Sequence, residues 1–514
     1  MGRPVPLVPD VRDLYSGAPF GADPTENPST EAAQPPMGNL EVPAGSEDRE
    51  RRVAAVSASV QGVSPEVLLG LEPHGPRGFW AREGRWFAHL GAAAIVEVND
   101  PSCGKGRFRE IWNGARRLFA CSWRDPESEV QPPSPRLFGG FAFRDGHVAE
   151  GAWEAFPSAR FILPEVELVG GDGKRAATGV LTCRSFLEPG DDPARCRERL
   201  RGRLSQVKAA LEAPGPSPPR GEIWIPATRM ETAPEAWDEA VDRALEEMAG
   251  GEISKVVLAR VQTVSAEGGL EPVDVAMNLW RDNPGAHVFL FESEPGHVFL
   301  GAAPETVATV SGGQFRATAV AGSADRGETE AQQKALARDL MKSSKDRREH
   351  EVCVEDMVER LRAVCEGVTA QDEPHVLTLS TIQHLETVIE ARLLPDQTVL
   401  SVLQTLHPTP AVCGLPRDPA LDFLEREERF QRGWYAGPVG WFDGDGNGAF
   451  VPALRSAVGR GKEWRLFAGA GILAGSDARR EWDETRIKFQ PVLRALALAR
   501  AGRSVAPASA SEEA

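Results

Sequence analysis

Residues 431–457 read QRGWYAGPVGWFDGDGNGAFVPALRSA, and this stretch decides the class of fold. Apolar residues fill both ends, and a cluster of Gly, Asp and Asn separates them, which is typical of a tight turn between two antiparallel strands. We therefore predict strands over 436–443 and 449–457. Outward from this hairpin, further strand-like runs lie near 251–260, 287–293, 297–301, 305–310, 314–320, 375–382 and 464–471.

The N-terminal half favours the same kind of sheet. Its strand-like pieces FWAREGRWFAHLG, LFGGFAF, ARFILPEVELVG and GVLTCRSF are separated by turns rather than by regular helices. This pattern favours antiparallel sheet over a doubly wound parallel sheet. Helices are predicted near 193–212, 233–250, 329–364 and 478–500.

Composition limits the classes of partner. The chain has 514 residues and a formal net charge of −17, which argues against a nucleic-acid partner or an anionic membrane surface, although a local cationic pocket could still hold a small anion. No apolar run reaches the roughly 20 residues needed to span a membrane. The seven cysteines lack C-x-x-C spacing, and we see no signal peptide. We therefore expect free thiols and a cytoplasmic location.

Shifts in composition predict the organisation of the chain. Segments rich in Pro, Gly, Ala and Glu without periodicity are typical of disordered tails, and APGPSPPRGE is typical of a joint. We expect a disordered tail over 1–48, a strand-rich N-terminal part over 49–212, a proline-rich joint over 213–224, a C-terminal part over 225–500 and a disordered tail over 501–514.

A lysine stands at the start of the strand-like run GEISKVVLAR, residues 251–260. In a strand, Lys255 shares one face with Val257 and Ala259. Burial on an apolar face lowers the pKa of a lysine, and a neutral amine can accept a proton from water. The alternative, more common for a single lysine, is a packed stem whose head reaches solvent or a carboxylate.

Several acidic side chains are candidates for proton transfer or metal binding. Glu305 follows a Gly-Ala-Ala-Pro turn and could be a general acid if its pKa is raised, or simply an exposed carboxylate. Glu349 could line a cleft or belong to a solvated helix face. Glu481, Glu484 and Lys488 share a helix face, which suits Mg²⁺ or only a surface ion pair.

Glycine-rich strand ends supply candidate backbone donors. Gly322 in AVAGSADRG would let successive N–H groups approach an anion closely, unless it forms an ordinary turn. Gly469 in LFAGAGILAG could present its amide in the same way. Ala411 lies in the proline-rich loop LHPTPAVCGLP, and Arg455 lies near the end of the second hairpin strand.

Taken in order, these segments resemble the chorismate-utilising enzymes: isochorismate, salicylate, anthranilate and aminodeoxychorismate synthases. The resemblance covers about 225–498 and is carried by SKVVLAR, GAAPE, AVAGSADRG, KDRREH, HLET, HPTPAVCGLP, RGWYAGPVGW, LRSA, AGAGI and EWDETRIK. It implies an α+β fold in which large antiparallel sheets form a sandwich core flanked by helices, with the active site in a cleft.

Within this family, the chain resembles the isochorismate synthases. Aminating members usually carry glutamine at the position of Lys255 or lysine at the position of Ala321, so this pair is typical of members that activate water. The alternatives are a salicylate synthase, an aminating enzyme that works with a glutamine amidotransferase, and a non-catalytic relative. GGFAF and FPSARFILPEVEL resemble the menaquinone-pathway branch, whereas the loop with Cys413 fits the siderophore or salicylate branches equally well.

The resemblance also implies a mechanism. Water would attack ring carbon 2 of chorismate while the hydroxyl leaves carbon 4, with Lys255 as the base and Glu305 as the acid. Mg²⁺ would be held by Glu349 and Glu484, with Glu481 close by. We expect a monomer or homodimer, without an obligate amidotransferase subunit. The implied substrate-binding residues are Gly322, Ser323, His384, Ala411, Arg455, Gly469 and Lys488.

Overall fold

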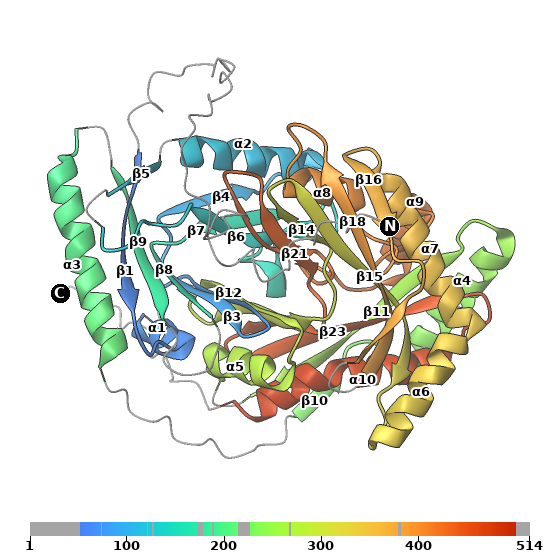
Figure 1. The fold of residues 1–514 in the computed structure, drawn as a ribbon. Coiled ribbons are helices and arrows are strands. Elements are labelled where there is room, and N and C mark those ends of the chain that lie inside the picture. Colours follow the sequence, from blue (N-terminus) through green and yellow to red (C-terminus); the bar gives the residue numbers. More distant parts are fainter. Residues whose placement is uncertain are drawn as a thin grey trace, which may run out of the picture.

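The computed structural model describes residues 52–72, 75–120, 122–125, 128–171, 178–187, 190–213, 227–266, 269–378 and 382–499. The predicted tails over 1–48 and 501–514, and the predicted joint over 213–224 apart from its first residue, lie outside this part of the chain. The described residues form two large sheets, of 13 and 10 strands, with helices around them (Figure 1). This arrangement confirms the predicted antiparallel class, because a single strand pair, at one edge, is parallel among those described.

The first sheet combines strands from both halves of the sequence. Its strands run antiparallel except for the last pair. In spatial order they are β10 (Ala227–Met230), β11 (Lys255–Ser265), β23 (Glu463–Leu473), β22 (Ser456–Arg460), β13 (His297–Ala303), β12 (His287–Glu294), β2 (Arg77–Arg82), β3 (Arg85–Leu90), β8 (Val166–Gly170), β9 (Gly179–Leu187), β1 (Arg52–Val60) and β5 (Ser122–Arg124), and β19 (Gly414–Leu415) also pairs with β11.

The second sheet is likewise built from both halves and faces the first. Its order is β16 (Cys365–Ala370), β18 (Ile382–Leu393), β15 (Gln314–Asp325), β14 (Ala308–Ser311), β21 (Gly448–Pro452), β20 (Pro438–Asp443), β6 (Arg136–Phe141), β7 (Ala159–Leu163) and β4 (Ala94–Val98), and β17 (His375–Thr378) pairs with β18.

Aromatic side chains fill the space between the sheets. The ring of Phe87 on β3 lies 5.6 Å from that of Phe138 on β6 and 5.7 Å from that of Trp441 on β20. All three rings are buried, and such pairs favour association of the two inner faces. The two sheets therefore form the predicted sandwich.

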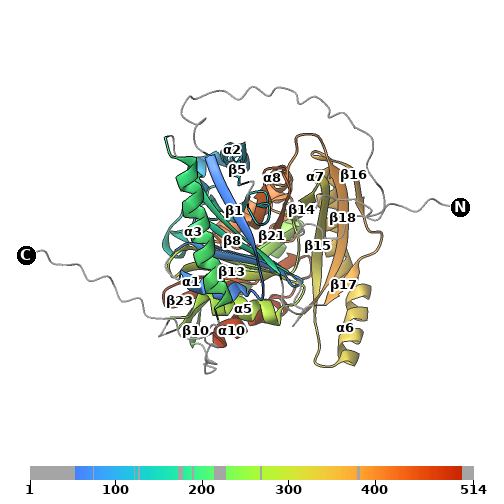
Figure 2. The same ribbon diagram turned by 60° about the vertical axis from the view of Figure 1, so that its left-hand side comes forward.

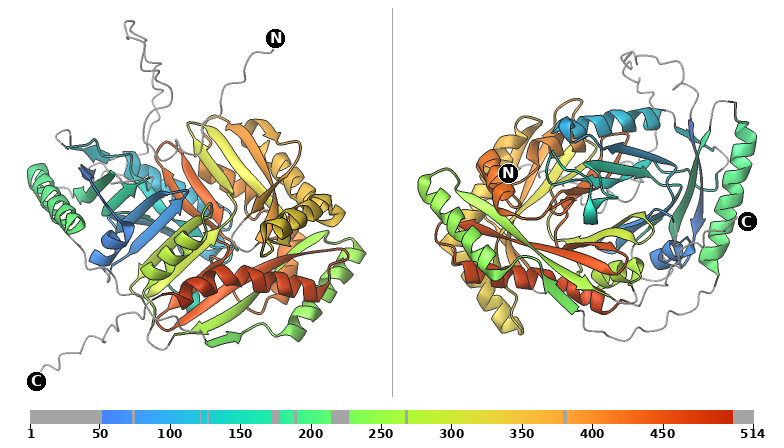
Figure 3. Two further views of the ribbon diagram at one scale, coloured as in Figure 1. Left: turned by 60° about the horizontal axis from the view of Figure 1, so that its bottom comes forward. Right: turned by 180° about the vertical axis from the view of Figure 1, so that it is seen from behind.

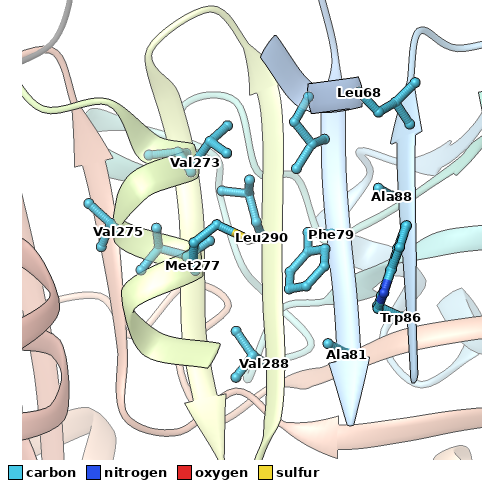
Figure 4. Packing of buried hydrophobic residues seen from close by; sticks show 14 of the residues in the cluster. Leu68, Phe79, Ala81, Trp86, Ala88, Val273, Val275, Met277, Val288 and Leu290 are labelled. Carbon is cyan, nitrogen blue, oxygen red and sulfur yellow. The ribbon is translucent and has the colours of Figure 1, made fainter. Parts of the chain in front are cut away.

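Helices cover the outer faces. The helices α5 (Pro272–Asp282) and α10 (Ala478–Ala497) lie side by side across the first sheet (Figure 3), and Met277 of α5 packs near Leu290 and Phe79 (Figure 4). Figure 2 shows α3 (Pro193–Glu212) along β1, and α6 (Glu330–Lys342) and α7 (Ser344–Leu361) beside β15 and β18. The other helices are α1 (Pro65–Leu71), α2 (Gly106–Ala120), α4 (Pro234–Gly250), α8 (Val399–Leu406) and α9 (Arg417–Glu427). None of these described helices has the length and apolar character needed to cross a membrane.

Two predicted elements are divided in the structure. The single helix predicted over 329–364 is broken at Ser343, whose side chain accepts a hydrogen bond from the Asp346 amide and so begins α7. The strand predicted over 449–457 is β21 followed by β22, which belong to different sheets. The chain crosses between the sheets at Arg455, whose φ of 48° turns the backbone there.

Candidate active site

A cavity of about 700 Å³, part of it open to solvent, lies where the two sheets diverge and contains side chains from both. Among its walls are β11 and β23 of the first sheet, β15 and β18 of the second, and α7 and α10. Every site residue predicted from the sequence lines it except Lys255 and Glu481. The lining members are Glu305, Gly322, Ser323, Glu349, His384, Ala411, Arg455, Gly469, Glu484 and Lys488.

Lys255 lies at the start of β11 behind the cavity wall, and its side chain is 1% exposed. Its Nζ is 3.0 Å from Oε1 of Glu349 and 3.3 Å from Sγ of Cys353. Burial disfavours the charged amine, but these two neighbours outweigh it and raise the pKa of Lys255. Burial also raises the pKa of the Cys353 thiol. Lys255 is therefore paired with Glu349, whereas the sequence predicted an unpaired, neutral amine; its role as the base stays a prediction.

Glu305 is a buried carboxyl on the cavity wall. It follows β13 and precedes β14, so it stands where the chain passes from the first sheet to the second. Burial raises the pKa of Glu305 to about 8, although Lys255, Lys488 and Arg455 oppose the shift. The carboxyl is therefore largely protonated at neutral pH, as a general acid must be.

Arg455 and His384 form a cationic corner of the cavity. Nη2 of Arg455 lies 2.9 Å from Nε2 of His384, and Nδ1 of His384 lies 3.0 Å from Oγ of Ser323 and 3.3 Å from the Gly322 carbonyl. A guanidinium can only donate, so Nε2 accepts and the hydrogen is on Nδ1. Burial lowers the pKa of His384 well below its ordinary value, which keeps the ring neutral. The histidine thus orients the arginine.

Arg455 is a buried cation without an anionic partner among the described residues. It is 7% exposed, and no carboxylate in that part of the chain lies within ion-pair distance of it. Burial lowers the pKa of Arg455 to about 10, which still leaves it charged. A charged guanidinium on a cavity wall is costly to bury unless an anion pairs with it.

Lys488 and Glu484 face the same cavity from α10. Lys488 Nζ lies 2.7 Å from Oε1 of Glu484 and donates to the Gly469 carbonyl at 2.9 Å. Burial alone would raise the pKa of Glu484, but Lys488 and Ser323 together lower it below its ordinary value. The Glu484 carboxylate is therefore charged. The ammonium group of its neighbour Lys488 is a second cation on the cavity wall, in addition to Arg455.

Backbone bends shape the rest of the wall. Gly322 is the extra residue of a bulge where the register of β15 and β18 shifts, and its φ of 74° is one that glycine tolerates. Ala411 lies on the wall in the loop between α8 and β19. The bulge places Gly322 and Ser323 on the cavity side of the sheet, as an anion-binding turn would require.

The carboxylates predicted to hold a metal ion do not form one cluster. Glu349 and Glu484 both line the cavity, but Glu481 does not, and Lys345 Nζ lies 3.1 Å from its Oε1. Among the described residues, no three His, Cys, Asp or Glu side chains are grouped as a metal site. That Glu481 lies close to the metal site stays a prediction: Glu481 does not line the cavity, and it is paired with Lys345, as Glu349 is with Lys255 and Glu484 with Lys488. Two carboxylates on one cavity still match the usual number of protein ligands of Mg²⁺, which keeps waters and substrate oxygens.

Sequence reasoning missed two residues of the site. Cys353 lies one helical turn after Glu349 on α7, a spacing that could have indicated it. Tyr435 lines the cavity and stacks on Phe467 with ring centroids 5.1 Å apart. It belongs to the RGWYAGPVGW motif, but no pattern in that motif distinguishes a wall residue from a core residue.

The sequence matches a known family along most of its length. A family model described as "Chorismate binding enzyme" matches residues 40–497. The chain is 36% identical over 461 residues to the "Salicylate biosynthesis isochorismate synthase" of Pseudomonas aeruginosa, covering 87% of this chain and 91% of that protein. It is 30% identical over 410 residues to "Isochorismate synthase MenF" of Bacillus subtilis, covering 79% of this chain and 84% of that protein.

Solved structures share the fold. The structure of MenF, "the Menaquinone-Specific Isochorismate Synthase from Escherichia coli", superposes with a TM-score of 0.70 at 26% identity, covering 87% of this chain and 95% of that chain. Anthranilate synthase component I from Streptococcus pneumoniae superposes with a TM-score of 0.62 at 20% identity, covering 90% and 95%, and so shares the fold alone. The predicted α+β architecture is therefore confirmed.

Proposed function

Because this chain belongs to the chorismate binding enzyme family, we propose that it is an isochorismate synthase, an isomerase that adds water at carbon 2 of chorismate and removes the hydroxyl from carbon 4. The observation that carries this proposal is Arg455, a buried guanidinium that faces the cavity without a carboxylate partner among the described residues. A dicarboxylate such as chorismate supplies the missing negative charge.

Arg455, Lys488 and the turn at Gly322 and Ser323 bind the carboxylate of the enolpyruvyl arm. The planar fork of Arg455 suits bidentate contact with a carboxylate, and His384 holds that fork in place. Gly469 contributes its carbonyl to Lys488, so it positions that ammonium in addition to the role predicted for its amide. Ala411 contacts the ring from the opposite wall.

Glu305 donates the proton that the leaving hydroxyl needs. Its pKa of about 8 keeps a proton on the carboxyl at neutral pH. A positioned acid of this kind accelerates a reaction by roughly 10²- to 10⁴-fold.

Lys255 accepts the proton from the attacking water. Its Nζ holds a proton for as long as Glu349 pairs with it at 3.0 Å. The amine can therefore act as a base only where this pairing with Glu349 is broken and the proton has left Nζ. The protonation state of Lys255 therefore depends on whether the Glu349 carboxylate is paired with it or with a group bound in the cavity.

Glu349 and Glu484 would hold Mg²⁺, since both carboxylates face the cavity and offer the hard oxygen ligands that this ion prefers. When bound, Mg²⁺ neutralises and orients the ring carboxylate of the substrate. Each of the two glutamates is paired with a lysine in the structure, and these pairings must loosen for the carboxylates to act as ligands. Glu481, held by Lys345, supports α10 from outside the cavity.

The experiment is to incubate the purified protein with chorismate, with Mg²⁺ or with EDTA, and to identify the product by mass and chromatography. We expect isochorismate, formed only with Mg²⁺. Fluorescent salicylate would indicate a salicylate synthase instead, and a product that changes on adding ammonium would indicate an aminating enzyme. Chorismate binding without turnover would overturn the proposal in favour of a non-catalytic relative.

The downstream pathway is a separate matter. The name of one relative refers to salicylate biosynthesis, and that of a solved structure refers to menaquinone. The step that these names share is the formation of isochorismate, and the proposal is limited to that step.

A further inference from the structure

The strand that carries Lys255 has a gap along one edge. One edge of β11 pairs with β23 over its whole length. The other edge pairs with β19 at Lys255 and Val256 and with β10 from Gln262 onward, so that residues 257–261 face no strand in the described part of the chain. Buried backbone groups in such a gap need partners from elsewhere.

The Cys413 carbonyl and two side chains from the segment after α9 fill this gap. The Val257 amide donates to the Cys413 carbonyl at 2.7 Å, and the Val257 carbonyl accepts from Nη2 of Arg432 at 2.6 Å. The Ala259 amide donates to Oε1 of Glu428 at 2.9 Å. Glu428 and Arg432 therefore take the place of a missing strand.

Arg432 also contacts the loop that lies against β11. Its Nη1 donates to the Val412 carbonyl at 2.8 Å, and its guanidinium lies 4.4 Å from the ring centroid of Phe143. It is paired with Glu428 through two contacts, Nη2 to Oε1 at 2.5 Å and Nε to Oε2 at 2.8 Å. The side chains are 2% and 3% exposed, so solvent does not compete with these contacts. One guanidinium thus joins Val257 on β11 to Val412 in the loop.

We propose that Glu428 and Arg432 are a positioning pair that fixes the loop of Ala411 and Val412 against β11, and so sets the distance between Lys255 and the substrate ring. This inference rests on the proposed function. Val257, Ala411 and Val412 all line the cavity, whereas neither Glu428 nor Arg432 does. The pair therefore acts through the elements it joins and not by contact with the substrate.

The test is Arg432→Lys. A lysine keeps the charge opposite Glu428 but cannot hold the Val257 and Val412 carbonyls together, because it lacks the planar fork. We expect kcat to fall by about 10- to 100-fold, since a displacement of about 1 Å costs this much. KM should change by less than about threefold, because Arg455 and Lys488 are on other elements. An unchanged kcat would overturn the proposal.

The chain offers a matched control in Arg77→Lys. Arg77 is 3% exposed, pairs with the buried Glu292 and donates to the Leu69 carbonyl at 2.8 Å, but it lies on β2 away from the cavity. Both variants should lower Tm, and only Arg432→Lys should lower kcat per folded molecule. An equal loss of kcat in both variants would show a merely structural role and would overturn the proposal.

A second variant, Glu428→Gln, covers the case in which Arg432→Lys does not fold. Hydrogen–deuterium exchange of residues 409–413 should rise in this variant and stay unchanged in Arg77→Lys, and unchanged exchange in both would overturn the proposal. Exchange does not depend on the reaction. If the unaltered protein forms no isochorismate, the proposed function is wrong. Hydrogen–deuterium exchange of residues 409–413 still tests whether Glu428 and Arg432 position the loop.

Discussion

The Glu349 carboxylate lies 3.0 Å from the Lys255 amine, a pairing that favours the protonated form of the base in the proposed reaction. The two residues come from different elements, α7 and β11. Glu349 is at once the partner that keeps Lys255 protonated and a carboxylate that faces the cavity. In the proposed mechanism, substrate binding and activation of the base are therefore coupled through this one side chain.

Replacing the base should separate chemistry from binding. Lys255→Ala should lower kcat by about 10²- to 10⁴-fold, because it removes the group that accepts the proton. Chorismate should still bind, since Arg455 and Lys488 are untouched, and this can be measured by calorimetry. Lys208→Ala, a surface change, is the control. Normal turnover by Lys255→Ala would refute the assignment of the base.

Activity should depend on pH through Glu305. The acid must be protonated to donate, and its pKa is about 8. We therefore expect kcat/KM to fall as the pH rises through about 8, because the free enzyme then loses this proton. Glu305→Gln should be nearly inactive and should lack this limb of the profile. A decline above pH 8 that persists in Glu305→Gln would assign the titration to another group.

Metal dependence should distinguish two neighbouring glutamates of α10. Glu484 lines the cavity, whereas Glu481 is paired with Lys345 outside it. Glu484→Ala should raise the Mg²⁺ concentration for half-maximal activity by about 10-fold or more, as loss of a group around a metal does. Glu481→Ala should raise it much less. Equal effects, or activity that EDTA leaves unchanged, would count against the proposed ligands.

Substrate affinity should depend on the fork of Arg455. A hydrogen bond to a charged group contributes roughly 1.5–3 kcal/mol, so losing the bidentate contact in Arg455→Lys should raise KM by about 10-fold or more. Arg460→Lys, at the end of the strand that follows Arg455, is the control, because Arg460 is 56% exposed and pairs with Glu154 on the surface. If KM is unchanged in Arg455→Lys, the substrate carboxylate is bound elsewhere.

The sequence predicted the sheets well where local signals are strong. The hairpin turn, the glycine-rich strand ends and α3 and α4 follow from turn chemistry and apolar periodicity, which act over short distances. The helices α1, α2, α5, α8 and α9 were missed, since they are short or amphipathic segments between strands whose helical form depends on packing. Ser343 was not recognised as a cap inside a charged run.

The site was predicted only in part, because short-range sequence patterns do not show contacts between distant elements. Motif spacing indicated most of the residues that line the cavity, but it could not indicate the charge state of Lys255, which depends on Glu349 on another element. Helical spacing placed Glu481 and Glu484 on one face of α10. It could not show that Lys345 of α7 covers one of them and not the other.

Glu305, the proposed proton donor, and Arg455, in the cationic corner, both lie at chain crossings between the sheets. The thickness of the aromatic layer formed by Phe87, Phe138 and Trp441 therefore sets the distance between the two sheets, and with it the geometry of the cavity. Trimming one of those rings would let the two halves settle closer, and the enzyme would lose catalytic alignment at a point remote from any reacting atom.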